Sequence, residues 1–129
     1  MRIVDEAWGR GLRPPERLTV SGWADKYRYM GHTSARPGRW RTDTVPMMRE
    51  IMDALGREHP AREVVLMKGT QLAGTEIGLN WLGSTIDSDP GMAMICWPDD
   101  KMADNNTRTR LDTMIAACPS LAAKIGDRK

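Results

Sequence analysis

Nine consecutive residues, Lys68 to Glu76 (KGTQLAGTE), combine the residue types that bind phosphate. A lysine neutralises phosphate charge, and the amide hydrogens of a glycine-containing turn can point together at an anion. The hydroxyl of Thr75 is suited to coordinate Mg²⁺ beside the phosphates. These residue types in this order predict a site for the phosphates of a nucleotide.

The spacing within this segment matches a Walker A phosphate loop only in part. Gly69 and Gly74 have the separation of the motif, but Thr75-Glu76 stands where Lys-Ser or Lys-Thr belongs. Phosphate binding then requires Lys68 to fold back over the loop from its first position. An ordinary turn between a strand and a helix explains the same residues equally well, so the pattern alone leaves both interpretations open.

A phosphate loop lies between a buried strand and the N-terminus of a helix, and the flanking sequence has this pattern. Residues 63–67 (EVVLM) are apolar and β-branched, which predicts a buried strand. Apolar residues then recur at helical spacing as far as Ile86. Residues 92–97 (MAMICW) predict a second strand. Strand, helix and strand within about 35 residues favour a parallel sheet with a right-handed crossover.

The rest of the chain predicts helices and connections around that unit. Ser21 is expected to N-cap a short helix that carries Trp23, and residues 31–44 are expected to form an extended connection. Apolar spacing predicts further helices over 46–55 and 103–117. The predicted fold class is α/β, a partial P-loop NTPase-like domain with helices flanking a parallel sheet. We expect an N-terminal helical or loop arm over 1–20 and the domain over 21–129.

Composition limits the classes of function. The 129 residues are 40% hydrophobic and 28% charged, as in a soluble folded domain, and the net charge of +2 creates no general attraction to nucleic acid. Contact with DNA would have to be local, and for the basic stretch at 36–41 (RPGRWR) we favour a solvated loop. Cys96 and Cys118 lack metal-ligand spacing and are expected to be buried thiols. The sequence has no run of about 18 apolar residues, so we expect no membrane contact.

Several residues that could carry chemistry have a simpler structural interpretation. The pair Asp99-Asp100 follows an apolar run, as a Walker B acid would, but Pro98 intervenes and favours a turn at the end of the strand. His32 and His59 are expected at the surface. The aromatic side chains are expected in the core rather than stacked on a base; they are Trp23, Tyr27, Tyr29 and Trp40.

Short matches in one order over nearly a hundred residues make the chain resemble a known family. That family is the ATPase domain of the large terminase subunit of tailed phages, in the lambda-like class. The matching residues are Trp23-Ala24-Asp25, Gly38-Arg39-Trp40, Pro46-x-x-Arg49-Glu50, Glu63-Val64-Val65-x-Met67-Lys68, Gln71, Gly74-Thr75-Glu76, Asn80-Trp81, Asp89-Pro90-Gly91, Trp97-Pro98-x-Asp100, Arg110-Leu111 and Pro119-x-Leu121.

The resemblance implies a nucleotide site and a biological setting. In this family the lysine of the deviant Walker A loop stands at its start, which makes Lys68 the phosphate contact and Thr75 the Mg²⁺ ligand. The implied ATP-binding residues are Lys68, Gly69, Thr70, Gln71, Gly74, Thr75 and Glu76. The implied role is in a motor that moves viral double-stranded DNA in the cytoplasm of the infected bacterium, with the terminase small subunit or the procapsid portal as partners and with possible self-association.

The chain departs from the family pattern at three places. Ala73 stands where the family has glycine, and a β-carbon there crowds phosphate or disfavours a positive φ angle. Met47 and Met48 occupy the stretch in which related motors have a glutamine. The sequence also lacks the Walker B acidic pair, the coupling motif and the nuclease domain. We therefore expect the Walker A half of a truncated ATPase domain, which is incomplete for hydrolysis by itself.

The alternative function is a non-enzymatic interaction module. Such a module would dock on a full-length terminase, or be recognised by a host factor that detects packaging proteins.

Overall fold

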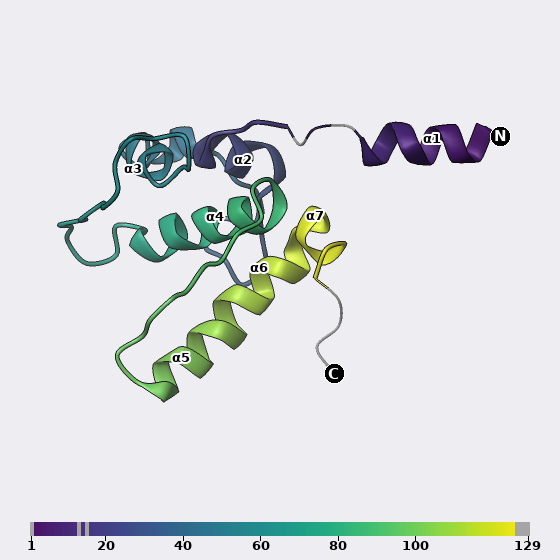
Figure 1. The fold of residues 1–129 in the computed structure, drawn as a ribbon. Helices are drawn as coiled ribbons and strands as arrows, with labels where there is room; N and C mark the ends of the chain where they lie inside the picture. Colours follow the sequence, from purple (N-terminus) through teal and green to yellow (C-terminus); the bar gives the residue numbers. More distant parts are fainter. Residues whose placement is uncertain (1, 13, 15, 126–129) are drawn as a thin grey trace.

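A computed structural model describes residues 2–12, 14 and 16–125, in which helices dominate (Figure 1). The strands β1 (Tyr29–Met30) and β2 (Gly38–Arg39) form an antiparallel pair, with Tyr29 opposite Arg39. A 3-10 turn, η1, covers Thr42–Thr44, and a π-helical turn, η2, covers Thr107–Leu111. The α-helices are α1 (Arg2–Gly11), α2 (Val20–Tyr27), α3 (Met48–Ala54), α4 (Gly74–Asp87), α5 (Asp100–Asn106), α6 (Asp112–Ala117) and α7 (Pro119–Ala122).

The helix α4 packs against α2, α3 and α7, and the core lies around Trp23 of α2. Trp23 is fully buried, and its indole Nε1 donates a hydrogen bond of 2.8 Å to Oδ2 of Asp87. Gly83 of α4 lies directly against the indole, since a β-carbon built there would be 2.3 Å from Cη2 of Trp23. Two clusters make up the core: Trp23, Ala24, Leu79, Met114, Cys118 and Leu121, and beside them Val20, Met48, Met52 and Ile77.

Asp87 ties the C-terminal end of α4 to the last described residues. Its carboxylate Oδ1 lies 2.7 Å from Nζ of Lys124. Burial acts to raise the pKa of Asp87, but the hydrogen bonds from Lys124 and Trp23 outweigh it, so the pKa lies below its ordinary value. The core tryptophan and the C-terminal segment are therefore held by one ionised carboxylate.

Local sequence signals explain the helices, with one correction. The helix predicted over 46–55 is confirmed as α3, and the helix predicted over 103–117 corresponds to the run of α5, η2 and α6. The N-cap of α2 is Thr19, whose Oγ1 accepts a hydrogen bond from the amide of Gly22, so the prediction of Ser21 was wrong. Ser21 instead lies inside α2, where its amide donates to Asp53 of α3 at 3.0 Å.

The parallel sheet predicted from 63–67 and 92–97 is not present in the described part of the chain. Neither segment has regular secondary structure, and neither pairs with a strand. Strand hydrogen bonds need a neighbouring strand, and the local apolar pattern that predicted these strands does not supply one. Cys96, predicted to be buried, is consequently exposed. The most exposed apolar side chains of the two segments are Val65 (82%), Met67 (98%), Met92 (105%) and Met94 (81%).

The N-terminal arm contains α1, which stands apart from the other helices (Figure 1). Val4, Trp8 and Leu12 recur at intervals of four residues and are all exposed, so this apolar stripe does not contribute to the core. Residues 1, 13 and 15 of the predicted arm and residues 126–129 of the predicted domain lie outside the described residues. No helix within the described ranges is long and apolar enough to cross a membrane.

Candidate functional site

The predicted phosphate loop connects the segment 63–67, which has no regular secondary structure, to the start of α4. Lys68, Gly69, Thr70 and Gln71 are exposed, whereas Gly74, Thr75 and Glu76 form the first turn of the helix and are partly buried. Two residues of the loop are non-glycine residues in the left-handed region, Gln71 at φ 59° and Ala73 at φ 50°. The chain therefore turns sharply into α4 through conformations that glycine adopts more easily.

The N-terminus of α4 presents free amide donors. Ala73 is its N-cap and gives no side-chain acceptor, and the amide of Ile77 makes the first helical hydrogen bond, to Ala73 O at 3.1 Å. The amides of Gly74, Thr75 and Glu76 therefore precede the helical ladder, at the positive end of the helix dipole. Backbone amides in this arrangement favour an anion such as phosphate.

Lys68 lies beside these donors although it precedes them by several residues. Its Nζ donates a hydrogen bond of 3.2 Å to the carbonyl of Gly69. Its methylene stem crosses Gly74 so closely that a β-carbon built there would be 2.2 Å from Lys68 Cε. The lysine thus folds back over the start of α4, and glycine at position 74 makes room for it.

Glu76 differs from the other predicted site residues because its carboxylate is held in an ion pair. Its Oε2 accepts a hydrogen bond of 2.8 Å from Nη2 of Arg28, whose side chain is 4% exposed. Its Oε1 lies 3.8 Å from Nη1 of Arg110 in η2. Sequence reasoning missed both arginines as partners of Glu76. The buried Arg28 lies within the Tyr27–Tyr29 stretch and carries no local signal of its role.

Asp99 and Asp100 do not end a strand, as the simpler interpretation predicted, but lie at the start of α5, of which Asp100 is the first residue. Asp99 is the N-cap of α5, and its Oδ1 accepts a hydrogen bond of 2.8 Å from the amide of Met102. Within the described residues, no group of three His, Cys, Asp or Glu side chains comes together to hold a metal ion.

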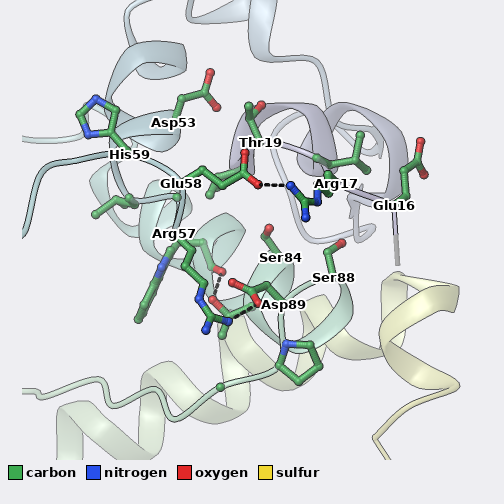
Figure 2. Close-up of a pocket in the computed structure, with 18 of the residues that line it drawn as sticks. Glu16, Arg17, Thr19, Asp53, Arg57, Glu58, His59, Ser84, Ser88 and Asp89 are labelled. Carbon is green, nitrogen blue, oxygen red and sulfur yellow. Dashed lines mark hydrogen bonds and ion pairs between the residues drawn. The ribbon is translucent and has the colours of Figure 1, made fainter. Parts of the chain in front are cut away.

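Two cavities border α4, one near each end of the helix. The larger, of about 1160 Å³, is at the opposite end of α4 and is bordered by the ion pairs Arg17–Glu58 (3.5 Å) and Arg57–Asp89 (2.6 Å) (Figure 2). Neither Lys68 nor Thr75 lines it. The smaller, of about 410 Å³, borders the first turn of α4, and its polar lining includes Arg28, Ser34, Glu76, Thr109, Arg110 and Thr113.

Ala73→Gly is expected to stabilise the loop. An alanine in the left-handed region costs roughly 1–2 kcal/mol, whereas the extra flexibility of glycine in the unfolded chain costs roughly 0.5–1 kcal/mol. We expect the free energy of unfolding, measured with denaturant, to rise by about 0.5–1 kcal/mol. The control is Ala103→Gly inside α5, where the same change is expected to lower it by about 1 kcal/mol. Equal losses in both variants would contradict strain at Ala73.

Comparison with known proteins places these features in a family. Residues 34–129 match the family model of the ATPase domain of the phage terminase large subunit gpA. The chain is 33% identical over 115 residues to the terminase large subunit of Escherichia phage lambda, an alignment that covers 88% of this chain and 18% of that protein. No solved structure matches the chain. The chain therefore belongs to the family of phage terminase large subunits, within the gpA-type ATPase domain.

Proposed function

We propose that the segment Lys68–Glu76 binds the phosphates of ATP as part of a motor that packages viral double-stranded DNA. The observation that carries the proposal is the position of Lys68, which folds over Gly74 beside three free amides at the start of α4. A cation and a ring of amide donors at one helix end are the two parts that a phosphate site needs. Membership of an ATPase-domain family makes ATP the anion to test first.

Each predicted residue has a specific part in this proposal. The amides of Gly69, Thr70 and Gln71 surround the phosphates from the loop, and Glu76 contributes its amide while its carboxylate pairs with Arg28. Thr75, in the first turn of α4, offers its hydroxyl to Mg²⁺. A single protein hydroxyl fits this ion, because Mg²⁺ in nucleotide sites is held mainly by phosphate oxygens and water. Bound Mg²⁺ would neutralise charge on the phosphates.

The same proposal includes a parallel sheet beside the phosphate loop. The exposed apolar segments 63–67 and 92–97 are the strands of a parallel sheet of the P-loop type, which forms when further strands pair with them. Exposure of Val65, Met67, Met92 and Met94 supports this, since β-branched and apolar side chains are stabilised by burial in a sheet. The chain spans only 18% of the length of its lambda relative.

The wider assembly follows from the family and is likewise proposed. The DNA would be moved in the cytoplasm of the infected bacterium, with the terminase small subunit and the procapsid portal as partners. The carboxylate of Asp99 caps α5 and so is not available as a Walker B acid, and we expect the chain to bind ATP without hydrolysing it efficiently.

The test is the effect of ATP on thermal unfolding. A ligand at one hundred times its Kd stabilises by about 2.7 kcal/mol, so Mg²⁺-ATP is expected to raise the Tm by roughly 5 °C or more. Lys68→Ala is expected to abolish the rise, because it removes the only side-chain cation proposed to contact the phosphates directly from the loop. Lys101→Ala, which removes a lysine from exposed α5, is the matched control and should retain it. A parent protein whose Tm does not respond to Mg²⁺-ATP would overturn the proposal.

A further inference from the structure

Arg110 is a loosely held cation close to the start of α4. Its guanidinium is half exposed and lies 3.8 Å from the Glu76 carboxylate, beyond hydrogen-bonding distance. An exposed ion pair of this length contributes little, so the guanidinium is free to exchange Glu76 for a better acceptor. Glu76 is the third residue of α4, so this pair places Arg110 beside the first turn of that helix.

Arg28, by contrast, is fixed. Its Nε donates to Asn80 Oδ1 at 3.1 Å, its Nη1 to the carbonyl of Tyr29 at 3.3 Å, and its Nη2 to Glu76 Oε2 at 2.8 Å. The negative charge of Glu76 is already balanced by the buried Arg28. The positive charge of Arg110 is therefore only partly balanced by Glu76. The start of α4 therefore attracts anions from two sides, from Lys68 on the loop and from Arg110 on η2.

The surroundings of Arg110 leave room for movement. The cavity of about 410 Å³ separates η2 from β1 and the loop that follows it, and Arg110, Thr109 and Glu76 all border it. A guanidinium that turns within this polar space keeps its hydration and needs no rearrangement of the core. Space and weak pairing together make Arg110 the mobile member of the cluster.

The backbone that carries Arg110 is the π-helical turn η2, between α5 and α6. Such turns are rare in helices and are frequent at functional sites. The hydroxyl of Thr109 donates to Asn105 O at 2.7 Å and that of Thr113 donates to Thr109 O at 3.0 Å, so side chains compete with the helical ladder here. On the C-terminal side, the buried Met114 holds α6 in the core. Adjustment is therefore easiest within residues 107–111.

We infer that Arg110 is a second phosphate-binding residue, which leaves Glu76 to bind the terminal phosphate of a nucleoside triphosphate held at Lys68–Thr75. The inference rests on the proposed function of that loop. When Arg110 binds the terminal phosphate, the backbone of η2 changes position. The flanking helices α5 and α6 move with it. A nucleoside diphosphate, which lacks that phosphate, leaves Arg110 beside Glu76.

The test compares ATP and ADP affinities, measured by calorimetry with Mg²⁺, in the parent and three variants. Arg110→Ala is expected to weaken ATP binding about tenfold or more and ADP binding by less than about threefold, because a charge-assisted bond to one phosphate is lost. Arg110→Lys keeps the charge and is expected to recover part of the loss. The matched control is Arg108→Ala, which removes an exposed arginine of the same turn that pairs with Asp104 at 2.9 Å and should change neither affinity.

The outcomes separate this inference from the proposed function. If Lys68→Ala loses ATP binding while Arg110→Ala binds ATP within about twofold of the parent, the role of Arg110 is wrong and the loop site stands. Equal losses of ATP and ADP in Arg110→Ala would also overturn it. If the parent protein binds no nucleotide, both the proposed function of the loop and the role of Arg110 are wrong. As a structural readout, ATP should slow amide hydrogen exchange over residues 107–111 in the parent and leave it unchanged in Arg110→Ala.

Discussion

Trp23→Ala is expected to lower the free energy of unfolding by about 3–5 kcal/mol, because it empties the centre of the core. The indole is fully buried between α2 and α4 and rests directly on Gly83. Its removal also leaves Asp87 without the 2.8 Å hydrogen bond from Nε1. The helices cannot close the gap completely, since Gly83 has no side chain to fill it. Denaturant unfolding followed by circular dichroism measures the loss.

The chain offers a matched control for this substitution. Trp8 is 64% exposed on α1, so Trp8→Ala removes the same atoms without creating a cavity and is expected to stay within about 0.5 kcal/mol of the parent. Should Trp23→Ala fail to fold, Trp23→Phe provides the measurement. It keeps most of the ring volume but loses the bond to Asp87, and a loss of about 1–2 kcal/mol is expected. Similar losses in Trp8→Ala and Trp23→Ala would contradict the assignment of this core.

The helices were predictable from the sequence because their signals are local. In α3 the apolar residues recur at helical spacing, and the buried Met48 and Met52 lie on the face that the spacing indicates. The strands were not predictable in this way. The local apolar pattern at 63–67 and 92–97 indicates only that these residues favour a strand conformation. A strand exists through hydrogen bonds to another strand, and none pairs with these segments in the described part of the chain.

In the candidate site, too, the local features were predictable from the sequence and the long-range contacts were not. The order of Lys68, Gly69 and Gly74 along the chain was enough to predict a loop before a helix, and the family pattern pointed to strain at Ala73, which has φ 50°. The partners of Glu76 were not predictable. Arg28 is 48 residues away in sequence and meets Glu76 only through the packing of α2 on α4. Contacts of this kind depend on the fold and leave no spacing to recognise.

Glu76→Ala, which breaks the ion pair with Arg28, is expected to lower the free energy of unfolding by about 3 kcal/mol. Arg28 is 3% exposed and would remain buried with its charge no longer balanced by the carboxylate. Its remaining bonds to Asn80 and Tyr29 O keep the loss at the lower end of the range for broken buried pairs. Denaturant unfolding followed by circular dichroism measures it.

Two further variants show whether the loss comes from the buried charge. Glu76→Gln keeps an oxygen acceptor for Arg28 and loses only the negative charge, so a smaller loss of about 1–2 kcal/mol is expected. Glu58→Ala removes a glutamate whose pair with Arg17 is almost fully exposed on both sides, and it should change stability by less than about 0.5 kcal/mol. If Glu76→Ala were no worse than Glu58→Ala, Arg28 would have to find another acceptor or reach solvent. In that event Glu76 would not be the residue that fixes the first turn of α4 against α2.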